Sequence, residues 1–530
     1  MRYLPTKPTR EHVLLIPLTL TLLAPFTSSS TLSPRQSSTF NATSLDPGFP
    51  ISNIITLATS LPAYSWEFGT AVTALIDLYT PNASAFTAPS LSPAPSLSVA
   101  SAPALQFARQ HISLAGLGGI NGLTQSDGAV GDPASLGIGA ILLGAGDWSN
   151  VEGISDGGTE MKGKYWDAAG AQLEYLLTGA PRYPNGAISQ RVEGPELWAD
   201  FMSMVPPFLA YFAVATNNGS LLQESVRQCA LYRDVLQPVP EDGSERGLWR
   251  HIVGPYSPDA GLWSTGNAWA AAGMARVLGT VMRAPSGMFN GVASSSTDSV
   301  ERRRRGSNLA RRDTLLSEDG YLMKHIKSWW KRMPQGSRSG GKRRRQVVDE
   351  VEDLVGGVVE LTTDEDDGGY SAWLSNSSGA QFRTRTQIIS FLTSFIQEIL
   401  SSIVDSASLD NGLVRNYVDD VSNTDGRGFG EVSGSALLAS VMYRMAVLAP
   451  GTFGEKYVEW ADNLRYTLGR WSGGGYVHVT SNGTVTPTVN PYGWGDTQPW
   501  TRGSPEGQAF VVLMYAAWRD CVSAGVCGAD

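Results

Sequence analysis

Apolar side chains recur three and four residues apart along most of the chain from Ile51 onward, and this spacing limits the possible folds more than any other feature. It is the period of one face of an α-helix, whereas a half-buried strand places apolar residues at every second position. Short joints rich in Gly, Pro and Asn separate the periodic segments, as in antiparallel helical hairpins. The predicted helices cover residues 66–79, 104–114, 134–143, 166–177, 198–215, 221–235, 266–282, 388–404, 434–448, 456–468 and 507–521.

Eleven or twelve helices in pairs, with little strand pattern between them, predict an all-α fold. We expect the hairpins to close into a ring, with residues 49–285 and 385–530 forming one domain. An open helical solenoid is the alternative architecture. It requires a repeat of fixed period, which this sequence does not show.

Residues 286–384 interrupt the helical pattern and form a long, charged insertion. Residues 302–345 carry 15 Lys and Arg against 3 acids, and an acidic run follows at 364–367. Blocks of like charge are usually solvated, so we expect the insertion to be disordered. An activation loop cut at dibasic sites and a polyanion-binding arm are functional alternatives. A lineage-specific loop and a gene-model artefact are simpler ones.

The N-terminus has the pattern of an export signal. Three basic residues lie within residues 1–12, an almost wholly apolar run covers 13–26, and small residues follow at 28–30. We therefore expect a signal peptide over residues 1–30, a flexible Ser/Thr/Pro-rich lead over 31–48 and a secreted, extracellular product. The apolar run is shorter than the ~20 residues that span a bilayer. We expect no membrane-spanning segment after the signal is removed.

Glycosylation motifs and cysteines agree with export. Five Asn-x-Ser/Thr sequons begin at residues 41, 82, 218, 376 and 482. Cys521 and Cys527 are close enough in sequence to close a small loop in an oxidising compartment. Cys229 lies in an apolar helical pattern and is expected to be a buried free thiol.

The charge distribution argues against nucleic acid as a partner. The net charge is −9, and the basic stretch 302–345 contributes +12, so the rest of the chain is near −21. An acidic body repels the phosphate backbone. The sequence does not indicate an oligomeric state.

Common catalytic motifs are missing, which leaves carboxylates as the candidates for chemistry. The chain has no Gly-x-Ser-x-Gly elbow, phosphate-binding loop or His-Glu-x-x-His pair, and its five histidines are dispersed. The dispersed histidines do not indicate a metal cluster.

Five acids lie among aromatic and glycine residues at predicted helix ends: Glu67, Asp132, Asp200, Glu431 and Glu506. Acids at such positions often cap helices, and this explanation is the simpler one for Asp132 and Glu506. Asp200 is different because Trp198 and Phe201 flank it. Aromatic surroundings raise the pKa of a carboxyl group toward the range of a general acid.

Tryptophans are concentrated in one stretch, with Trp249, Trp263 and Trp269 around His251 and Asn267. Indole faces can stack on pyranose rings, while Asn and His bind hydroxyl groups. The alternative is simple core packing, the more common fate of a single Trp. The cluster favours a carbohydrate site.

Four stretches resemble the six-hairpin glycosidases, in particular the unsaturated rhamnogalacturonyl and glucuronyl hydrolases of glycoside hydrolase families 105 and 88. Trp-Glu-Phe-Gly-Thr-Ala at 66–71 is similar to the first inner helix of that ring. The stretch 197–210 is similar to the segment with the catalytic aspartate. Residues 247–251 and 262–269 resemble the substrate-binding hairpin, and Ser-Pro-Glu-Gly-Gln-Ala at 504–509 resembles the closing helix.

This resemblance implies an (α/α)6 barrel with its active cleft at one mouth. Family members act on sugars with a C4–C5 double bond, the ends that polysaccharide lyases leave. An aspartate protonates the vinyl ether, water adds at C5, and the hemiketal rearranges to release the next sugar. By motif position the resemblance makes Asp200 the proton donor and Asp132 the second aspartate. It also implies a substrate-binding set of Trp66, Trp198, His251, Trp263, Asn267 and Trp269, and no cofactor.

Three departures from the family pattern bear on the substrate. Thr265 stands where these enzymes usually carry an Arg, which binds carboxylates bidentately. Gln190 stands near an expected His, and a Gly-rich insertion covers residues 147–163. The leading hypothesis is removal of an unsaturated uronyl residue from a pectin-type or related oligosaccharide. The alternatives are a two-carboxylate glycosidase acting on another glycan and a non-catalytic glycan-binding protein on the same barrel.

Overall fold

A computed structural model describes residues 41–115, 119–238, 247–289, 384–406, 412–421, 426–493 and 498–529. The chain divides into a unit of residues 1–41 and a unit of residues 42–530, and the second contains every element discussed below. The predicted signal peptide, most of the predicted lead and residues 290–383 of the expected insertion lie outside the described residues.

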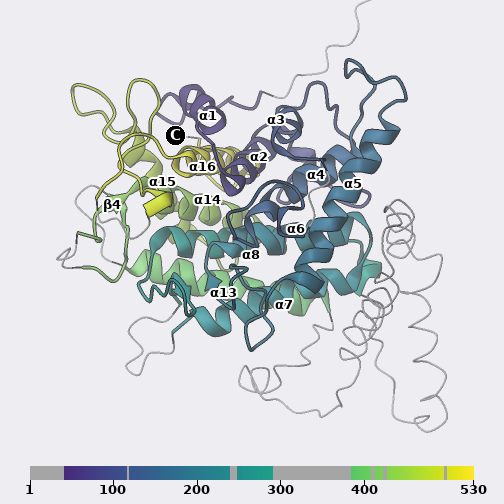
Figure 1. Ribbon diagram of the computed structural model, residues 1–530. Coiled ribbons are helices and arrows are strands. Elements are labelled where there is room, and N and C mark those ends of the chain that lie inside the picture. Colours follow the sequence, from purple (N-terminus) through teal and green to yellow (C-terminus); the bar gives the residue numbers. More distant parts are fainter. Residues whose placement is uncertain are drawn as a thin grey trace, which may run out of the picture. The chain divides into compact units, whose positions relative to one another are not determined.

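Twelve α-helices within the described residues form six successive hairpins. Element labels follow Figure 1. The pairs are α1 (Ile51–Ser60) with α2 (Ser65–Tyr79), α3 (Pro103–His111) with α4 (Gly137–Ala145), α5 (Thr159–Glu174) with α6 (Phe201–Ala215), α7 (Gly219–Leu236) with α8 (Ser264–Arg283), α13 (Arg385–Asp405) with α14 (Val432–Leu448), and α15 (Glu455–Gly469) with α16 (Pro505–Ser523). The 3₁₀ turn η3 (Asp132–Leu136) leads directly into α4, and the π-helical turn η4 (Tyr175–Gly179) extends α5.

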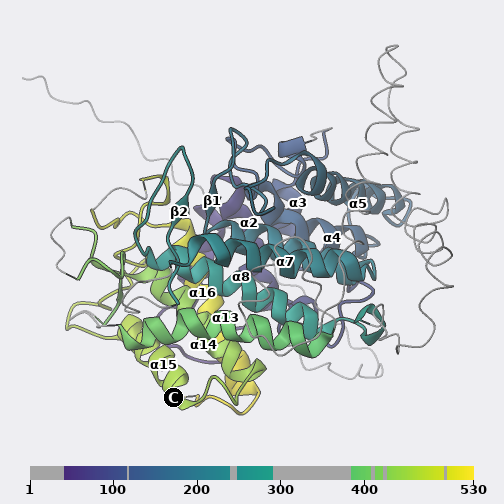
Figure 2. The same cartoon turned by 90° about the horizontal axis from the view of Figure 1, so that it is seen from below.

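The second helix of each hairpin belongs to an inner ring. The helices α2, α4 with η3, α6, α8, α14 and α16 pack in this order, and α16 returns to α2. The first helix of each hairpin lies outside this ring, and α13, for example, lies beside α8 in Figures 1 and 2. Because α16 contacts α2, the ring is closed. The predicted all-α (α/α)6 barrel is confirmed, and the open solenoid is excluded.

Burial patterns explain which helices lie inside. The inner helix α8 is buried at every residue from Ser264 to Val281 and is rich in Ala and Gly, which allow close packing on both sides. The outer helix α15 buries Tyr457, Ala461, Leu464 and Leu468, which lie on one face at the helical period. A helix buried all round belongs in the centre, and an amphipathic helix belongs on the outside.

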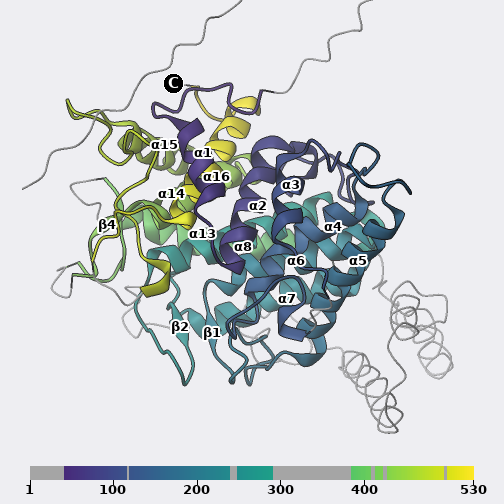
Figure 3. The same ribbon diagram turned by 45° about the horizontal axis from the view of Figure 1, so that its top comes forward.

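Two short two-stranded sheets lie where inner helices begin. Strand β1 (Leu197–Trp198) pairs antiparallel with β2 (Ile252–Val253), and β3 (Val414–Arg415) with β4 (Gly430–Glu431). Figure 3 shows the C-terminus at the opposite end of the helices from β1 and β2. Trp198 was predicted to start a helix, but it pairs with Ile252, and α6 begins only at Phe201.

The described residues include the end of the predicted lead and both ends of the predicted insertion. Residues 42–48 of the expected lead contact α16, because the Tyr515 hydroxyl donates to the Leu45 carbonyl at 2.9 Å and Ala42 is buried. Ser286–Phe289 forms a 3₁₀ turn, and Thr384 caps α13. The helix α1 was absent from the predicted set.

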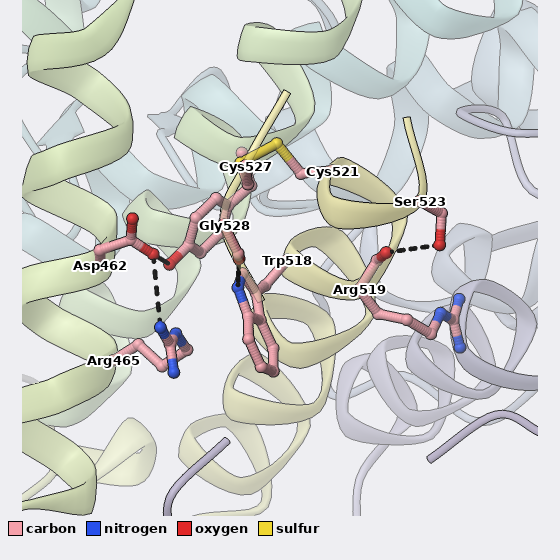
Figure 4. The surroundings of a disulfide bond; sticks show 9 residues. Asp462, Arg465, Trp518, Arg519, Cys521, Ser523, Cys527 and Gly528 are labelled. Carbon is pink, nitrogen blue, oxygen red and sulfur yellow. Dashed lines mark hydrogen bonds and ion pairs between the residues drawn. A yellow bond between two sulfur atoms is a disulfide. The ribbon is translucent and has the colours of Figure 1, made fainter. Parts of the chain in front are cut away.

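The C-terminal ends of the inner helices hold a buried ion network. Asp77 Oδ2 lies 2.6 Å from Arg276 Nη2 and 3.6 Å from Arg444 Nη2, and Arg444 Nη1 lies 2.5 Å from Asp520 Oδ2. Just beyond, the predicted disulfide Cys521–Cys527 is present (Figure 4). Cys229 is buried and free, as predicted.

One described helix, α13, is long and apolar enough to cross a membrane by length and composition. This differs from the expectation that no later segment meets that criterion. However, α13 is an outer helix of the barrel that packs against α8. Helices that pack into folded domains commonly meet the same criterion. The packing of α13 against α8 accounts for its buried apolar residues.

Candidate active site

The N-terminal ends of the inner helices bring the five acids together. Glu67 lies in the first turn of α2, Asp132 at the start of η3, Asp200 before α6, Glu431 before α14 and Glu506 in the first turn of α16. Asp200 interacts electrostatically with Asp132 and Glu506, and Glu506 also with Glu67 and Glu431. Helix N-termini stabilise negative charge, which favours this arrangement.

Two of these acids, Glu67 and Glu431, cap helices, although capping was the simpler explanation for Asp132 and Glu506. Glu67 Oε2 accepts from the Tyr64 backbone N–H at 3.0 Å, and Glu431 Oε1 accepts from the Gly434 N–H at 2.6 Å. By contrast, Ser504 rather than Glu506 caps α16, and neither Asp132 nor Asp200 makes a side-chain cap bond. The capping explanation therefore does not account for Asp132, Asp200 and Glu506.

Asp200 lies at the head of a chain of side chains that leads into the protein. Its Oδ2 is 3.4 Å from His251 Nε2, and the side chain is 16% exposed, against 1% for His251. His251 Nδ1 lies 2.9 Å from Asp259 Oδ2, which also accepts from the Tyr417 hydroxyl at 2.5 Å. Burial opposes the charge on His251, but bonds and charges from Asp200 and Asp259 outweigh it and raise the pKa of His251. Asp200 and Asp259 therefore both favour the protonated form of the His251 imidazole.

Asp132 is buried next to this chain. Burial raises its pKa to about 7, although a hydrogen bond from Gln190 Nε2 at 2.9 Å acts in the opposite direction, and the charges of Asp127 and Asp200 raise it further. Gln190 Oε1 in turn accepts from the Gly131 N–H at 3.2 Å. Gln190, which stands near the position of an expected His, thus holds the Asp132 side chain in place.

Glu506 is the most strongly perturbed acid of the group. Burial, with the neighbouring charges of Glu67 and Asp200, raises its pKa well above the ordinary range. Its Oε1 accepts from Trp66 Nε1 at 2.7 Å. Glu67 accepts a short hydrogen bond from the Tyr492 hydroxyl, and the Trp66 and Tyr492 rings lie 5.9 Å apart. Glu506 therefore fixes the orientation of the Trp66 ring, and Glu67 that of the Tyr492 ring.

Trp198 and Trp263 are brought to the Asp200 site. The Trp198 ring meets His251 edge-on at 5.9 Å, and the Trp263 ring centre lies 4.3 Å from that of His251. Trp198 is half-buried, whereas Trp263 is buried and donates to Asn416 Oδ1 at 2.8 Å. Trp198 and Trp263 thus both contact the His251 ring, and only Trp198 is partly exposed.

Asn267 and Trp269 are placed inside the barrel. The Asn267 amide donates to the carbonyls of Trp249 and Trp263 and accepts from the Trp249 N–H, so it is used within the fold. Trp269 is buried against Phe510 and lines a cavity of about 30 Å³ among the inner helices. Thr265 is also buried, and its hydroxyl donates to Glu431 Oε1 at 3.2 Å.

The prediction from sequence missed Glu196, Asp259 and Tyr417. Asp259 and Tyr417 complete the chain that starts at Asp200, and buried Glu196 holds the Trp198 indole through a 2.7 Å hydrogen bond. All three lie in connecting segments. Glu196 and Asp259 lie near Trp198 and His251 in the sequence, whereas nothing in the sequence pointed to Tyr417. No group of three or more His, Cys, Asp or Glu residues in the described part of the chain is arranged to hold a metal ion.

Two comparisons with known proteins bear on this site. Residues 159–287 match the family described as Glycosyl Hydrolase Family 88. The match indicates a glycoside hydrolase. It includes Asp200, His251 and the tryptophans around them, whereas Asp132 and Trp66 lie outside it. No curated protein sequence matches the chain significantly.

Solved structures share the barrel at low sequence identity. A possible member of glycoside hydrolase family 105 from Klebsiella pneumoniae has a TM-score of 0.51 and 12% identity, covering 93% of this chain and 99% of its own. A family 105 glycoside hydrolase from C. acetobutylicum has a TM-score of 0.50 and 11% identity, covering 89% and 99%. These similarities show the six-hairpin fold.

Proposed function

We propose that the protein is a secreted hydrolase that removes an unsaturated uronyl residue from lyase-generated oligosaccharides of the pectin type or a related type. The proposal rests on the family match over the Asp200 segment, the sequence resemblance and one observation of geometry. That observation is the Asp200 carboxyl group, which lies against His251 at the cleft and is not used to cap its helix.

The proposed reaction is hydration of the C4–C5 double bond. Asp200 gives the proton that it shares with His251 to C4, which leaves positive charge at C5 and the ring oxygen. The Asp200 carboxylate then takes a proton from the water molecule that adds at C5. The resulting hemiketal opens and releases the neighbouring sugar. The proton on Asp200 is restored, so atoms and charge balance.

The neighbouring acids allow a uronate to bind even though Thr265 replaces an Arg. Burial raises the pKa of Asp132 to about 7 and raises that of Glu506, which favours the neutral form of both groups. Neutral acids do not repel a uronate and can donate hydrogen bonds to it. Recognition by neutral donors is weaker than by an Arg fork. We therefore expect a high KM.

The first test measures loss of the ultraviolet absorbance of the conjugated uronate in lyase-digested rhamnogalacturonan. We expect the wild-type protein to remove the absorbance and Asp200→Asn to lower the rate at least about 100-fold, the usual contribution of general acid–base catalysis. Asp234→Asn, an exposed aspartate on α7, is the matched control and should act like the wild type. Equal rates for Asp200→Asn and the control would exclude Asp200 as the acid.

A second candidate is a conventional glycosidase with two carboxylates. It is favoured by the raised pKa of Asp132 beside Asp200, since general acids in such enzymes have raised values. Release of the aglycone from saturated nitrophenyl glycosides, without any change in a conjugated uronate, would identify this activity. A purely glycan-binding role is less supported, because Asp200 contacts His251 rather than backbone amides.

Secretion is part of the proposal. The disulfide Cys521–Cys527 suits an oxidising compartment. Among the sequons, Asn82 and Asn482 have exposed side chains, whereas Asn218 Oδ1 caps α7 by accepting from the Leu221 N–H at 3.0 Å. Asn82 makes no helix-capping bond, and the hydrogen bonds of Asn482 Oδ1 stay within its own turn, from Thr480 and Thr484. We expect these two sites to be occupied before Asn218.

A further inference from the structure

The cavity of about 30 Å³ among the inner helices lies between the acids of the candidate active site and the ion network at the C-terminal ends of these helices. Residues of α2, α6, α8, α14 and α16 line it, among them Arg276 and Arg444. Its volume is enough for a small ion or for water, and it is too small for a sugar ring. The proposed reaction does not use this cavity.

Arg444 brings unused hydrogen-bond donors to the cavity. Its side chain is only 4% exposed, and its Nη1 lies 2.5 Å from Asp520 Oδ2. Its Nη2 reaches Asp77 Oδ2 only at 3.6 Å, and neither Nη2 nor Nε makes a hydrogen bond to a described residue. These two nitrogens form one edge of the planar guanidinium, so a single acceptor can bind both. Burying the donors of a charged group without an acceptor is costly.

The rest of the cavity wall also favours an anion. The Trp269 indole is buried, and its Nε1 makes no hydrogen bond to a described residue either. Thr73 and Ser440 contribute hydroxyl groups, which can donate as well as accept. None of the described residues that line the cavity is an acid. A wall of guanidinium, indole and hydroxyl groups without a carboxylate suits an anion and disfavours a metal ion.

The ion network beside the cavity contains more cations than anions. Within the described residues, its guanidinium groups belong to Arg276, Arg283, Arg444 and Arg519, and its carboxylates to Asp77 and Asp520. Arg276 binds Asp77 through both terminal nitrogens. Arg283 and Arg519 donate to backbone carbonyl oxygens. A further negative charge beside Arg444 is therefore favoured, because buried charges are stable only when they are paired.

We propose that this cavity binds a chloride ion, held by the Nε–Nη2 edge of Arg444 with the Trp269 indole as a further donor. Chloride is close to water in size and carries the negative charge that the network lacks. Sulfate and phosphate are too large for this volume. The bound ion connects α14 to α8 at the centre of the barrel and stabilises the folded protein. The inference does not rest on the proposed function, because it concerns an ion inside the fold and not the substrate.

The first test measures thermal unfolding while chloride replaces gluconate at constant ionic strength. We expect the Tm of the wild type to rise by about 1–2 °C for each tenfold increase in chloride above its Kd, because a ligand of the folded state stabilises that state. Arg444→Lys keeps the charge but removes the two-nitrogen edge, so this rise should be lost. Arg283→Lys is the matched control, since Arg283 belongs to the same network but does not line the cavity, and should keep the rise.

A second measurement locates the ion without any variant. Anomalous scattering from crystals of the protein soaked in bromide should show a peak within hydrogen-bond distance of Arg444 Nε. If Arg444→Lys does not fold, this peak and the chloride dependence of the wild type decide together. A Tm that follows ionic strength alone, equal chloride dependence in both variants, or water without bromide in the cavity overturns the proposal. A bromide peak without any chloride-dependent Tm identifies an adventitious ion only, and overturns it as well.

Discussion

At the scale of single residues, the decisive contact is the one between His251 and its two carboxylates. Asp200 meets one ring nitrogen and Asp259 the other, so the proton on His251 is stabilised from both sides. Burial raises the energy of an uncompensated charge, but these two acids reverse that effect and raise the pKa of His251. Asp259 therefore acts on Asp200 only through the His251 ring that lies between them.

We predict that Asp259→Asn lowers the pKa of His251 and shifts the pH–rate profile to lower pH. A fall of one unit changes the protonated fraction up to about tenfold above that pKa. The measurement is kcat/KM for the unsaturated substrate between pH 4 and 8. Tyr417→Phe removes only one hydrogen bond to Asp259 and should shift the profile less. A loss of activity with an unshifted profile would mean that Asp259 acts only on the fold.

The sequence identified residues that form part of this site but not the partners that orient them. Asp200, Trp198 and His251 stood out because an acid, an indole and an imidazole are unusual in apolar surroundings. Asp259 and Glu196 looked like ordinary loop acids, since their roles depend on contacts made by folding. Asn267 shows the converse. An amide among tryptophans suits a sugar, but here it satisfies backbone groups of Trp249 and Trp263.

At the scale of elements, helix positions were predictable and helix ends were less so. The apolar period placed α2, α7 and α13 within a few residues of their observed bounds. Local pairing decided the ends. Residues 197–198 form a strand with 252–253, so α6 starts three residues later than predicted. These ends matter because the acids of the site lie on them.

The disulfide after α16 gives a prediction about one element. Cys521 and Cys527 close a loop with a sequence separation of 6, and loop-closure entropy for so short a loop corresponds to about 2 kcal/mol. We expect the double variant Cys521→Ser with Cys527→Ser to be less stable by about 2 kcal/mol and therefore to unfold at a lower temperature. Reductant should lower the Tm of the wild type but not of the variant. Equal sensitivity of both proteins to reductant would contradict this role.

At the scale of the whole molecule, closure of the barrel could not be seen in local patterns. The contact between α16 and α2 joins segments more than 400 residues apart, and no helical period carries that information. A closed ring was expected because the paired helices lack the fixed-period repeat of a solenoid. The resemblance of residues 66–71 and 504–509 to the first and closing helices of the six-hairpin enzymes added which helices meet. The neighbour of each helix in the ring could thus be predicted from the family resemblance but not from the local apolar pattern.

The two ends of the barrel hold buried acids with opposite responses to pH. At the C-terminal ends of the inner helices, burial opposes ionisation of Asp77, but the charges of Arg276 and Arg444 outweigh it and lower its pKa. At the N-terminal ends, burial raises the pKa of Asp132 to about 7 and raises that of Glu506. An acid whose pKa is lower in the folded state stabilises that state at pH values above its pKa in the unfolded chain. This stabilisation is lost as the pH falls through its folded pKa. A raised pKa destabilises the folded state as pH rises from the unfolded value to the folded one.

We therefore predict that stability is greatest near about pH 4, because the contribution of Asp77 is lost below the unfolded pKa of an aspartate and the cost of ionising Asp132 and Glu506 grows above it. The rise of the Asp132 pKa from its ordinary 3.8 to about 7 alone corresponds to about 4 kcal/mol of stability lost by pH 8. Thermal unfolding from pH 3 to 8 measures this. Asp132→Asn mimics the protonated acid and should flatten the fall above pH 5, whereas Asp77→Asn leaves Arg276 and Arg444 without a shared counter-ion and should cost about 3–5 kcal/mol at neutral pH. A wild-type Tm that is constant between pH 5 and 8 would show that the acids at the cleft ionise normally.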